Sequence, residues 1–323
     1  MMQSETVIVS EPQIPLIDFA SQKLKPGTDE WVSTCEAVRI ALEDHGGFLV
    51  LFDEFDDKPN HIYASSKQLF DLPTQTKMQK TSDKPNHGYF GPGPLNPLFE
   101  SHAIDNPLSL QVCQNFASIM WAEGNESFSG AVNAYASGLV ELDRKVKRMV
   151  FESYGVDSKK CESFLESNNY TMRLYKYMPA RKEEGEKGIG AHRDTTLFTI
   201  LHQQMHGLEI KNKHGQWVRV DASPSLFCVV AGEAFSVWSN DRIRPCTHQV
   251  TIKSKTSPRY SIGLLSYASR TLHPAEELVD EQHPIRYKPF NHYQYLASIY
   301  TKQALNSSQN RLKTYCGIED INI

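Results

Sequence analysis

The chain has 323 residues, of which 40% are hydrophobic and 22% are charged, a balance that permits a packed core and excludes wholesale disorder. Its 34 lysines and arginines against 38 aspartates and glutamates give a net charge of −4, which argues against a nucleic acid or an anionic membrane as the main partner. No apolar run approaches the about 18 residues of a membrane span. Residues 1–12 also lack the basic cluster and long apolar stretch of a secretory signal, so we expect a cytosolic enzyme or binding protein.

The six cysteines stand far apart, and no two of them form a Cys-x-x-Cys pair. A chain of this length builds its core without covalent cross-links, and the cytosol keeps thiols reduced. We therefore expect free, mainly structural cysteines. The spacing excludes a zinc site built on cysteine.

The first half of the chain is predicted to be mainly helical. A short strand is expected at 14–19, and apolar residues at helical spacing predict a helix over 29–43. The continuous apolar run at 48–52 predicts a buried strand. A second helix is expected over 57–71, and the longest over 129–154, where apolar residues recur at steps of three and four.

The segment 84–107 contains five prolines and three glycines, with Tyr89, Phe90 and Phe99 between them. Such a composition predicts a loop rather than a helix or strand. Two interpretations stay open: an ordinary surface loop, or a segment whose aromatic residues form a wall of a binding site.

From Tyr170 onward the sequence consists of short β-rich runs divided by turn residues, and one such turn is expected at 185–188. Short strands about 8–12 residues apart predict an antiparallel sandwich or jelly roll. The chain is therefore expected to be mainly β with a helical N-terminal part, and to end with a helix over 291–305. The predicted strands cover 170–178, 197–203, 207–210, 217–220, 226–231, 235–238, 249–253 and 260–267.

His192 and Asp194 stand two residues apart at the start of a β-rich run. Residues two apart on a strand point to the same side, so the imidazole and the carboxylate converge. His248 opens another run, 54 residues after Asp194, and can supply a second imidazole. Two histidines and one carboxylate on one face of a metal leave the opposite face open, an arrangement that suits non-haem Fe(II) and oxygen activation.

Arg259 and Ser261 form another pair of residues two apart, and Arg259 stands eleven residues beyond His248. A guanidinium grips a carboxylate with two parallel hydrogen bonds, and a serine hydroxyl adds a further donor. Tyr177, on an earlier predicted strand, can add a phenol. A metal site and an anion clamp on neighbouring strands are what a dicarboxylate co-substrate requires, with one end on the metal and the other on the arginine.

These motifs, in this order, resemble the plant Fe(II)/2-oxoglutarate-dependent dioxygenases. The segments 14–18 and 47–50 resemble the opening segment of that family, so the likeness covers nearly the whole chain. Residues 119–125 and 174–177 resemble the subgroup of glucosinolate side-chain-modifying, auxin-oxidising and alkaloid-hydroxylating dioxygenases. The motifs that carry the family likeness are Tyr177-x-Pro179, Gly190-Ala-His192-Arg-Asp194, Trp238-Ser-Asn240, His248-Gln-Val250 and Arg259-Tyr-Ser261.

The resemblance implies a double-stranded β-helix, or jelly-roll, core at 169–270, preceded by a helical N-terminal region at 1–168 and followed by a helical segment at 271–323. Two positions depart from the family pattern. Many members have Asn where this chain has Tyr175, which bears on how the 2-oxoglutarate carboxylate is held, and many have Arg at the position of Gln249. The implied ligands are His192, Asp194 and His248 for Fe(II), and Arg259, Ser261 and Tyr177 for 2-oxoglutarate.

The resemblance implies oxidation, most simply hydroxylation, of a small specialised metabolite or hormone, with release of succinate and CO2. O2 is then the second co-substrate, and ascorbate is the expected stimulant. The alternative is a non-catalytic ligand-binding or sensor protein on the same scaffold, in which the triad or the clamp would be eroded; both are complete here. We expect a cytoplasmic monomer whose partner is a small molecule, with no nucleic acid and no membrane.

Strand geometry also suggests residues for the organic substrate. If Arg259 faces the barrel interior, alternation turns Leu265 inward too, about 20 Å further along the strand. Many family members have an aromatic residue here, so a leucine favours a bulky aliphatic or polycyclic substrate; the alternative is that Leu265 belongs to the core. The other wall of the substrate site is expected from Tyr89, Phe90, Phe99 and Trp121.

Overall fold

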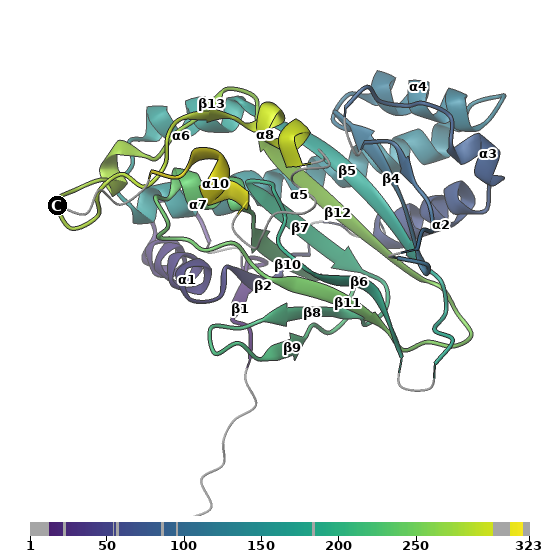
Figure 1. Cartoon of the computed structure of the whole chain (residues 1–323), viewed down its shortest axis with the longest axis horizontal. Coiled ribbons are helices and arrows are strands. Elements are labelled where there is room, and N and C mark those ends of the chain that lie inside the picture. Colours follow the sequence, from purple (N-terminus) through teal and green to yellow (C-terminus); the bar gives the residue numbers. More distant parts are fainter. Residues whose placement is uncertain are drawn as a thin grey trace, which may run out of the picture.

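The structure, a computed structural model, describes residues 13–21, 24–53, 55, 58–84, 87–94, 96–182, 185–299 and 311–318. Two main sheets pack face to face, and helices cover the outer face of the larger one (Figure 1). The helices are α1 (Asp29–His45), α2 (Lys58–Phe70), α3 (Thr74–Lys77), α4 (Leu110–Met120), α5 (Glu126–Ser153), α6 (Ser158–Glu166), α7 (Glu233–Trp238), α8 (His292–Ile299) and α10 (Arg311–Cys316), with a 3-10 turn at Glu276–Leu278. The strands are β1 (Leu16–Asp18), β2 (Gly47–Leu51), β3 (Tyr89–Phe90), β4 (Phe99–Asp105), β5 (Asn168–Tyr177), β6 (Glu186–His192), β7 (Phe198–Gln203), β8 (Leu208–Lys211), β9 (Trp217–Arg219), β10 (Leu226–Ala231), β11 (His248–Ile252), β12 (Arg259–Ala268), β13 (Thr271–Leu272) and β14 (Phe290–Asn291).

The strands β5 to β12 pass back and forth between the two sheets. The larger sheet has the order β1-β2-β10-β7-β12-β5-β4-β3, and the smaller one has the order β6-β11-β8-β9. Two facing sheets that the chain enters in turn form a double-stranded β-helix. The predicted fold class is thus confirmed, and β1 to β4 from the N-terminal region extend the larger sheet at both edges.

The larger sheet separates two apolar cores. On its outer face, Tyr260, Ile262 and Leu264 of β12 pack with the helices, including the amphipathic α5. On its inner face, a smaller cluster with Tyr177 and Phe99 fills the space between the sheets. All six cysteines are buried and free, as predicted. Among the described helices, none has both the length and the apolarity that crossing a bilayer requires.

Two predicted elements of the β region were wrong. Residues 235–238 belong to helix α7 rather than to a strand, since a short apolar run does not by itself distinguish the two. The predicted turn at 185–188 lies largely in strand β6, which runs from 186 to 192. This strand is at the edge of the smaller sheet and is half exposed, so its sequence lacks the apolar signature of a buried strand.

The proline-rich segment contains more regular structure than predicted. Within it, β4 pairs with β5 over seven residues, from Phe99 opposite Tyr177 to Asp105 opposite Thr171. The prolines lie before and after this strand, which is why a composition-based interpretation as loop missed it. Of the predicted last helix, the structure describes α8 at 292–299, and residues 300–305 lie outside the described residues.

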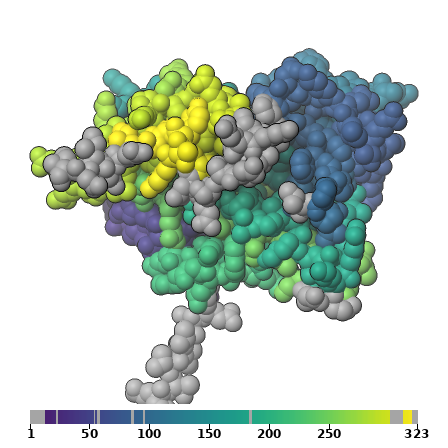
Figure 2. All heavy atoms as spheres, in the orientation of Figure 1, coloured from purple at the N-terminus to yellow at the C-terminus, as the bar shows by residue number. Residues whose placement is uncertain are grey.

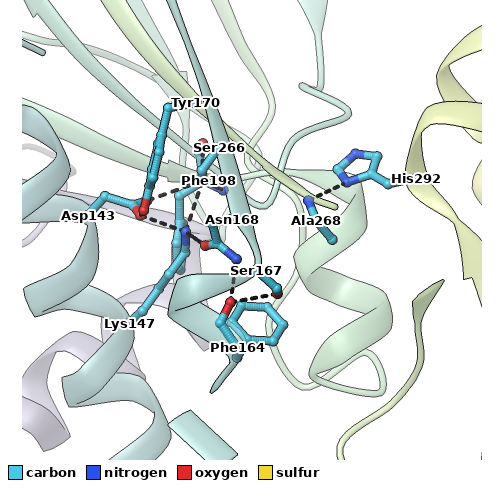
Figure 3. A network of polar contacts seen from close by, with 10 residues as sticks. All are labelled: Asp143, Lys147, Phe164, Ser167, Asn168, Tyr170, Phe198, Ser266, Ala268 and His292. Atoms are coloured by element: carbon cyan, nitrogen blue, oxygen red, sulfur yellow. Dashed lines mark hydrogen bonds and ion pairs between the residues drawn. The ribbon is translucent and has the colours of Figure 1, made fainter. Parts of the chain in front are cut away.

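A buried polar network ties α5 to the sheet (Figure 3). The Lys147 Nζ donates to Asp143 (2.6 Å), to Asn168 (2.5 Å) and to the Ser266 hydroxyl (3.1 Å). The Tyr170 hydroxyl also donates to Asp143, at 2.9 Å. The network thereby links one helix to the strands β5 and β12, which form the centre of the larger sheet.

We expect Lys147→Met to lower the free energy of unfolding by about 3–5 kcal/mol, because it leaves the Asp143 carboxylate buried without its cation. The measurement is urea unfolding followed by circular dichroism. Lys160→Met is the control: this exposed lysine pairs with Glu276 and Glu277, and its loss should change the free energy of unfolding far less than the loss of Lys147. Equal effects of the two substitutions would contradict a stabilising role for the network.

Candidate active site

The three predicted metal ligands converge at one end of the two sheets. His192 is the last residue of β6 and lies opposite His248, the first residue of β11. The His192 Nε2 lies 3.6 Å from one Asp194 oxygen, and the His248 Nε2 lies 3.9 Å from the other. The ligand atoms lie within 4.8 Å of one another, and no other such group of His, Cys, Asp or Glu occurs in the described ranges.

Backbone carbonyls orient both histidine rings. The Nδ1 of His192 lies 2.9 Å from the Gly190 oxygen, and the Nδ1 of His248 lies 3.3 Å from the Cys246 oxygen. A carbonyl only accepts hydrogen bonds, so each Nδ1 carries the proton. The lone pair of each Nε2 is therefore directed towards Asp194, as a metal ligand requires.

Burial and neighbouring charges set the ionisation of the triad. Burial raises the pKa of the Asp194 carboxyl, but His248, His192 and a hydrogen bond with Thr199 outweigh it and hold this pKa below its usual value. Burial and the nearby His192 lower the pKa of His248, against the opposing effect of Asp194. At neutral pH the site therefore presents a carboxylate and a neutral His248 imidazole, donors that suit Fe(II).

Arg259, at the start of β12, is 2% exposed and is held by neutral groups. Its guanidinium donates to the Met205 carbonyl (3.0 Å), the Gln203 side-chain oxygen (2.7 Å) and the Ser261 hydroxyl (3.1 Å). It lies over the Tyr177 ring, 4.9 Å from the ring centre. Within the described part of the chain no carboxylate pairs with it. A buried cation without a counter-ion is unfavourable, so this position fits an anionic ligand.

Two cavities meet at the triad. The inner cavity lies between the sheets and extends from the triad to Arg259. The outer cavity, of about 330 Å³, extends from the triad past β4 to α8 and α10. His192, Asp194, Tyr175 and Ile189 line both cavities. A co-substrate at Arg259 and an organic molecule in the outer cavity would therefore reach the same metal from two sides.

The predicted substrate-site residues are only partly brought together. Phe90, Phe99 and Leu265 line the outer cavity. Tyr89 lies on the other side of its strand from Phe90, and its hydroxyl donates to a carboxylate of β4 at 2.8 Å. Trp121 follows α4 and packs against the first turn of α5. Neither Tyr89 nor Trp121 lines a cavity at the triad.

Sequence reasoning missed three residues of the site: Gln203 at the clamp, Thr199 beside Asp194, and Arg173 in the outer cavity. Gln203 lies opposite Ser261 in the β7–β12 pairing, and this register is not visible in the sequence. A signal did exist for Arg173, which stands four residues before Tyr177 on the same strand. The alternation that turns Tyr177 inward also turns Arg173 inward.

Comparisons with known proteins identify the family of the chain. A family model described as the 2OG-Fe(II) oxygenase superfamily matches residues 167–266, and one described as non-haem dioxygenase in morphine synthesis N-terminal matches residues 14–97. The chain is 36% identical over 294 residues to a probable 2-oxoglutarate-dependent dioxygenase, AOP1.2, of Arabidopsis thaliana. The aligned region covers 88% of this chain and 90% of that protein.

Two solved structures share the fold. The dioxygenase for auxin oxidation of rice has a TM-score of 0.78 at 24% identity, over 95% of this chain and 100% of that one. The dioxygenase for auxin oxidation 1 of Arabidopsis thaliana, solved with 2-oxoglutarate, has a TM-score of 0.72 at 25% identity, over 84% of this chain and 100% of that one.

The fold and the site define a non-haem iron oxygenase of the jelly-roll type. The chain belongs to the 2OG-Fe(II) oxygenase superfamily and is a 2-oxoglutarate-dependent dioxygenase, an enzyme that uses Fe(II) and 2-oxoglutarate. The donor set fits that metal, because one carboxylate and two imidazoles with free Nε2 atoms converge. The predicted family, enzyme class and cofactors are confirmed.

We expect His192→Ala, Asp194→Ala and His248→Ala each to weaken iron binding by at least about 100-fold, because two donors do not hold a labile divalent ion. Anaerobic titration with Fe(II), or with Mn(II) followed by electron paramagnetic resonance, measures this. His206→Ala is the control, since this half-exposed imidazole lies outside the triad. Normal iron affinity in any of the three variants would show that the metal is bound elsewhere.

We expect Arg259→Ala to weaken 2-oxoglutarate binding by about 30-fold to several thousand-fold, the equivalent of about 2–5 kcal/mol, and to leave iron affinity unchanged. The absorption band of the anaerobic iron–2-oxoglutarate complex reports the affinity directly. Arg219→Ala, which removes an exposed arginine of β9, should have no effect. An unchanged 2-oxoglutarate affinity in the Arg259 variant would place the clamp elsewhere.

Proposed function

We propose that this enzyme hydroxylates a small specialised metabolite or hormone. In the overall reaction, one atom of O2 enters the organic substrate as a hydroxyl group, and the other enters succinate as 2-oxoglutarate loses CO2. The observation that carries the proposal is the meeting of two cavities at the triad, with a buried arginine at the far end of one of them that pairs with no carboxylate of the described residues.

In this proposal His192, Asp194 and His248 hold Fe(II), which when bound supplies oxygen activation. The protein's own residues position the reactants. Arg259, Ser261 and Tyr177 bind the distal carboxylate of 2-oxoglutarate.

The chemistry of these three residues suits that role. Burial raises the pKa of Tyr177 to about 12, although Arg259 and Ser261 act in the opposite direction. The phenol therefore stays protonated at neutral pH and can donate to the carboxylate. The guanidinium is already oriented by Gln203 and the Met205 carbonyl, so its fork is fixed before the ligand arrives. The keto-acid end of the ligand is then directed towards the triad.

The organic substrate is proposed to occupy the outer cavity, with Phe90, Phe99 and Leu265 as its apolar wall. Two relatives are named for the oxidation of auxin, a small hormone, which supports a substrate of this size. A non-catalytic sensor is not favoured, because both the triad and the anion clamp are complete.

We further propose a cytoplasmic monomer whose partners are small molecules, with ascorbate as a stimulant and no nucleic-acid or membrane partner. In this proposal residues 1–168, 169–270 and 271–323 are the helical N-terminal region, the dioxygenase core and a C-terminal helical segment of one catalytic unit. The net charge of −4 supports the absence of a nucleic-acid partner. Light scattering during gel filtration tests the oligomeric state.

The proposed activity is tested with purified protein, Fe(II), ascorbate and 2-oxoglutarate, to which fractions of plant metabolites are added. We expect at least one fraction to stimulate succinate formation and to yield a product heavier by one oxygen atom in mass spectrometry. Asp194→Ala gives the background. A fraction that binds without stimulating succinate formation above this background would favour the sensor instead.

We expect Leu265→Phe to shift the preference among accepted substrates towards smaller ones, because it adds a ring to the wall of the outer cavity. Leu265→Ala, which enlarges the cavity, should shift the preference in the opposite direction. Relative rates over the accepted substrates measure both shifts, and iron and 2-oxoglutarate affinities should stay unchanged. Lower thermal stability with unchanged preference would assign Leu265 to the core.

A further inference from the structure

The outer cavity carries a charge opposite in sign to that of the protein. The described residues that line it include Arg173, Arg193, Arg311 and His87, whereas their one carboxylate is the triad residue Asp194. The chain as a whole has a net charge of −4. A concentration of positive charge in a concave, partly apolar site attracts an anion.

Arg173 lies in the middle of β5 and faces this cavity. Its neighbours in register are Ala103 of β4 and Gly263 of β12, and the side chains of Tyr175 and Leu201 fill the space beside Gly263. Its Nη1 donates to the Ser101 hydroxyl at 3.0 Å, which orients the guanidinium. A guanidinium is a planar group of donors whose geometry matches a carboxylate.

His87 adds an oriented imidazole to the same cavity. Asp105, two residues beyond Ala103 on β4, accepts a hydrogen bond from the His87 Nδ1. This carboxylate also accepts from the Ser82 hydroxyl (2.7 Å) and the Thr171 hydroxyl (3.0 Å), and the Lys84 Nζ lies 3.8 Å from it. Asp105 therefore fixes the ring, and the His87 Nε2 donates to a ligand's carboxylate when the imidazole carries a proton on both nitrogens.

The other side chains of the cavity define an apolar part. It is formed by residues of β3, β4, β6, β12 and α8. In Figure 2 the blue N-terminal part and the yellow C-terminal part lie on opposite sides of this face of the molecule. A molecule that complements both the positively charged and the apolar lining of the cavity has one anionic group and an apolar body. The apolar lining residues are Phe90, Phe99, Ile189, Leu265, Leu296 and Ile299.

We propose that the organic substrate is a carboxylic acid, whose carboxylate binds Arg173 and His87 and whose apolar body lies against Phe99 and Leu265. This inference rests on the proposed function and names the class of its substrate. The two anion sites are separate. Arg259 pairs with Tyr177 of β5, and Arg173 lies four positions before Tyr177, roughly 13 Å along the strand. One site thus serves the co-substrate and the other the molecule to be oxidised.

Binding without turnover tests the proposal. The protein is loaded with Mn(II) and 2-oxoglutarate without oxygen, and calorimetry then measures the affinity for a series of aryl- and alkyl-substituted carboxylic acids, each beside its neutral primary amide. We expect the acids that bind to do so at least about 10-fold more tightly than their amides. Arg173→Gln should weaken binding of the acids by about 10- to 100-fold and leave the amides nearly unchanged.

Matched variants sharpen the result. Arg173→Lys keeps the charge without the fork and should have an intermediate effect, and His87→Gln should weaken the acids by several-fold. Arg270→Gln removes an equal charge from an exposed position that lines neither cavity at the triad, and should change nothing. The affinity of Arg173→Gln for Mn(II) and 2-oxoglutarate should equal that of the unmodified protein, which also shows that the variant is folded.

Three results would overturn the inference: no acid bound in preference to its amide, equal losses in the Arg173 and Arg270 variants, or a loss of 2-oxoglutarate affinity in Arg173→Gln. The last result would assign Arg173 to the co-substrate. Failure of the proposed function is seen separately, as a failure of the unmodified protein to bind Mn(II) and 2-oxoglutarate before any organic acid is added.

Discussion

The ten-residue antiparallel pairing between β5 and β12 fixes the positions of Arg259, Ser261, Tyr177 and Arg173 relative to one another. It places Tyr177 opposite Arg259, Tyr175 opposite Ser261, and Arg173 opposite Gly263. β7 pairs with β12 and β4 pairs with β5, so side chains of all four strands lie next to one another on the inner face of the sheet. A slip of one residue would turn Arg259 into the helical core and Tyr260 into the cavity. The burial of both faces of β12 therefore enforces the register on which the clamp depends.

The larger of the two apolar cores mainly stabilises the fold, and the smaller one contains the ligand-binding site. The large cluster between the sheet and the helices contains most of the buried apolar residues and surrounds the network of Lys147 and Asp143. The small cluster between the sheets contains the site and accommodates polar side chains. A site with a buried arginine and an ionised carboxylate is costly by itself. The helical core supplies the apolar burial that offsets this cost.

The sequence predicts best those features that depend on the alternation of side chains along a single strand. Arg259 and Ser261 stand two residues apart on β12 and share a face whatever their partners are, so the sequence singles them out as a pair. His192 ends β6 and Asp194 follows outside the strand, so their approach depends on the turn and not on strand alternation. Contacts across strands depend on register, which is why Gln203 was missed. Local composition failed where tertiary context decides: β6 is a polar edge strand, 235–238 is an apolar helical turn, and β4 lies among prolines.

The unequal exposure of the three triad side chains has a consequence for how metal reaches and leaves the site. The side chain of His192 is 34% exposed, whereas those of Asp194 and His248 are 18% and 5% exposed. A metal ion therefore reaches the site from the His192 side, where the outer cavity begins. An organic molecule that fills this cavity closes the same route. Iron should therefore exchange with solvent more slowly from the enzyme with a filled outer cavity than from the enzyme that holds 2-oxoglutarate alone.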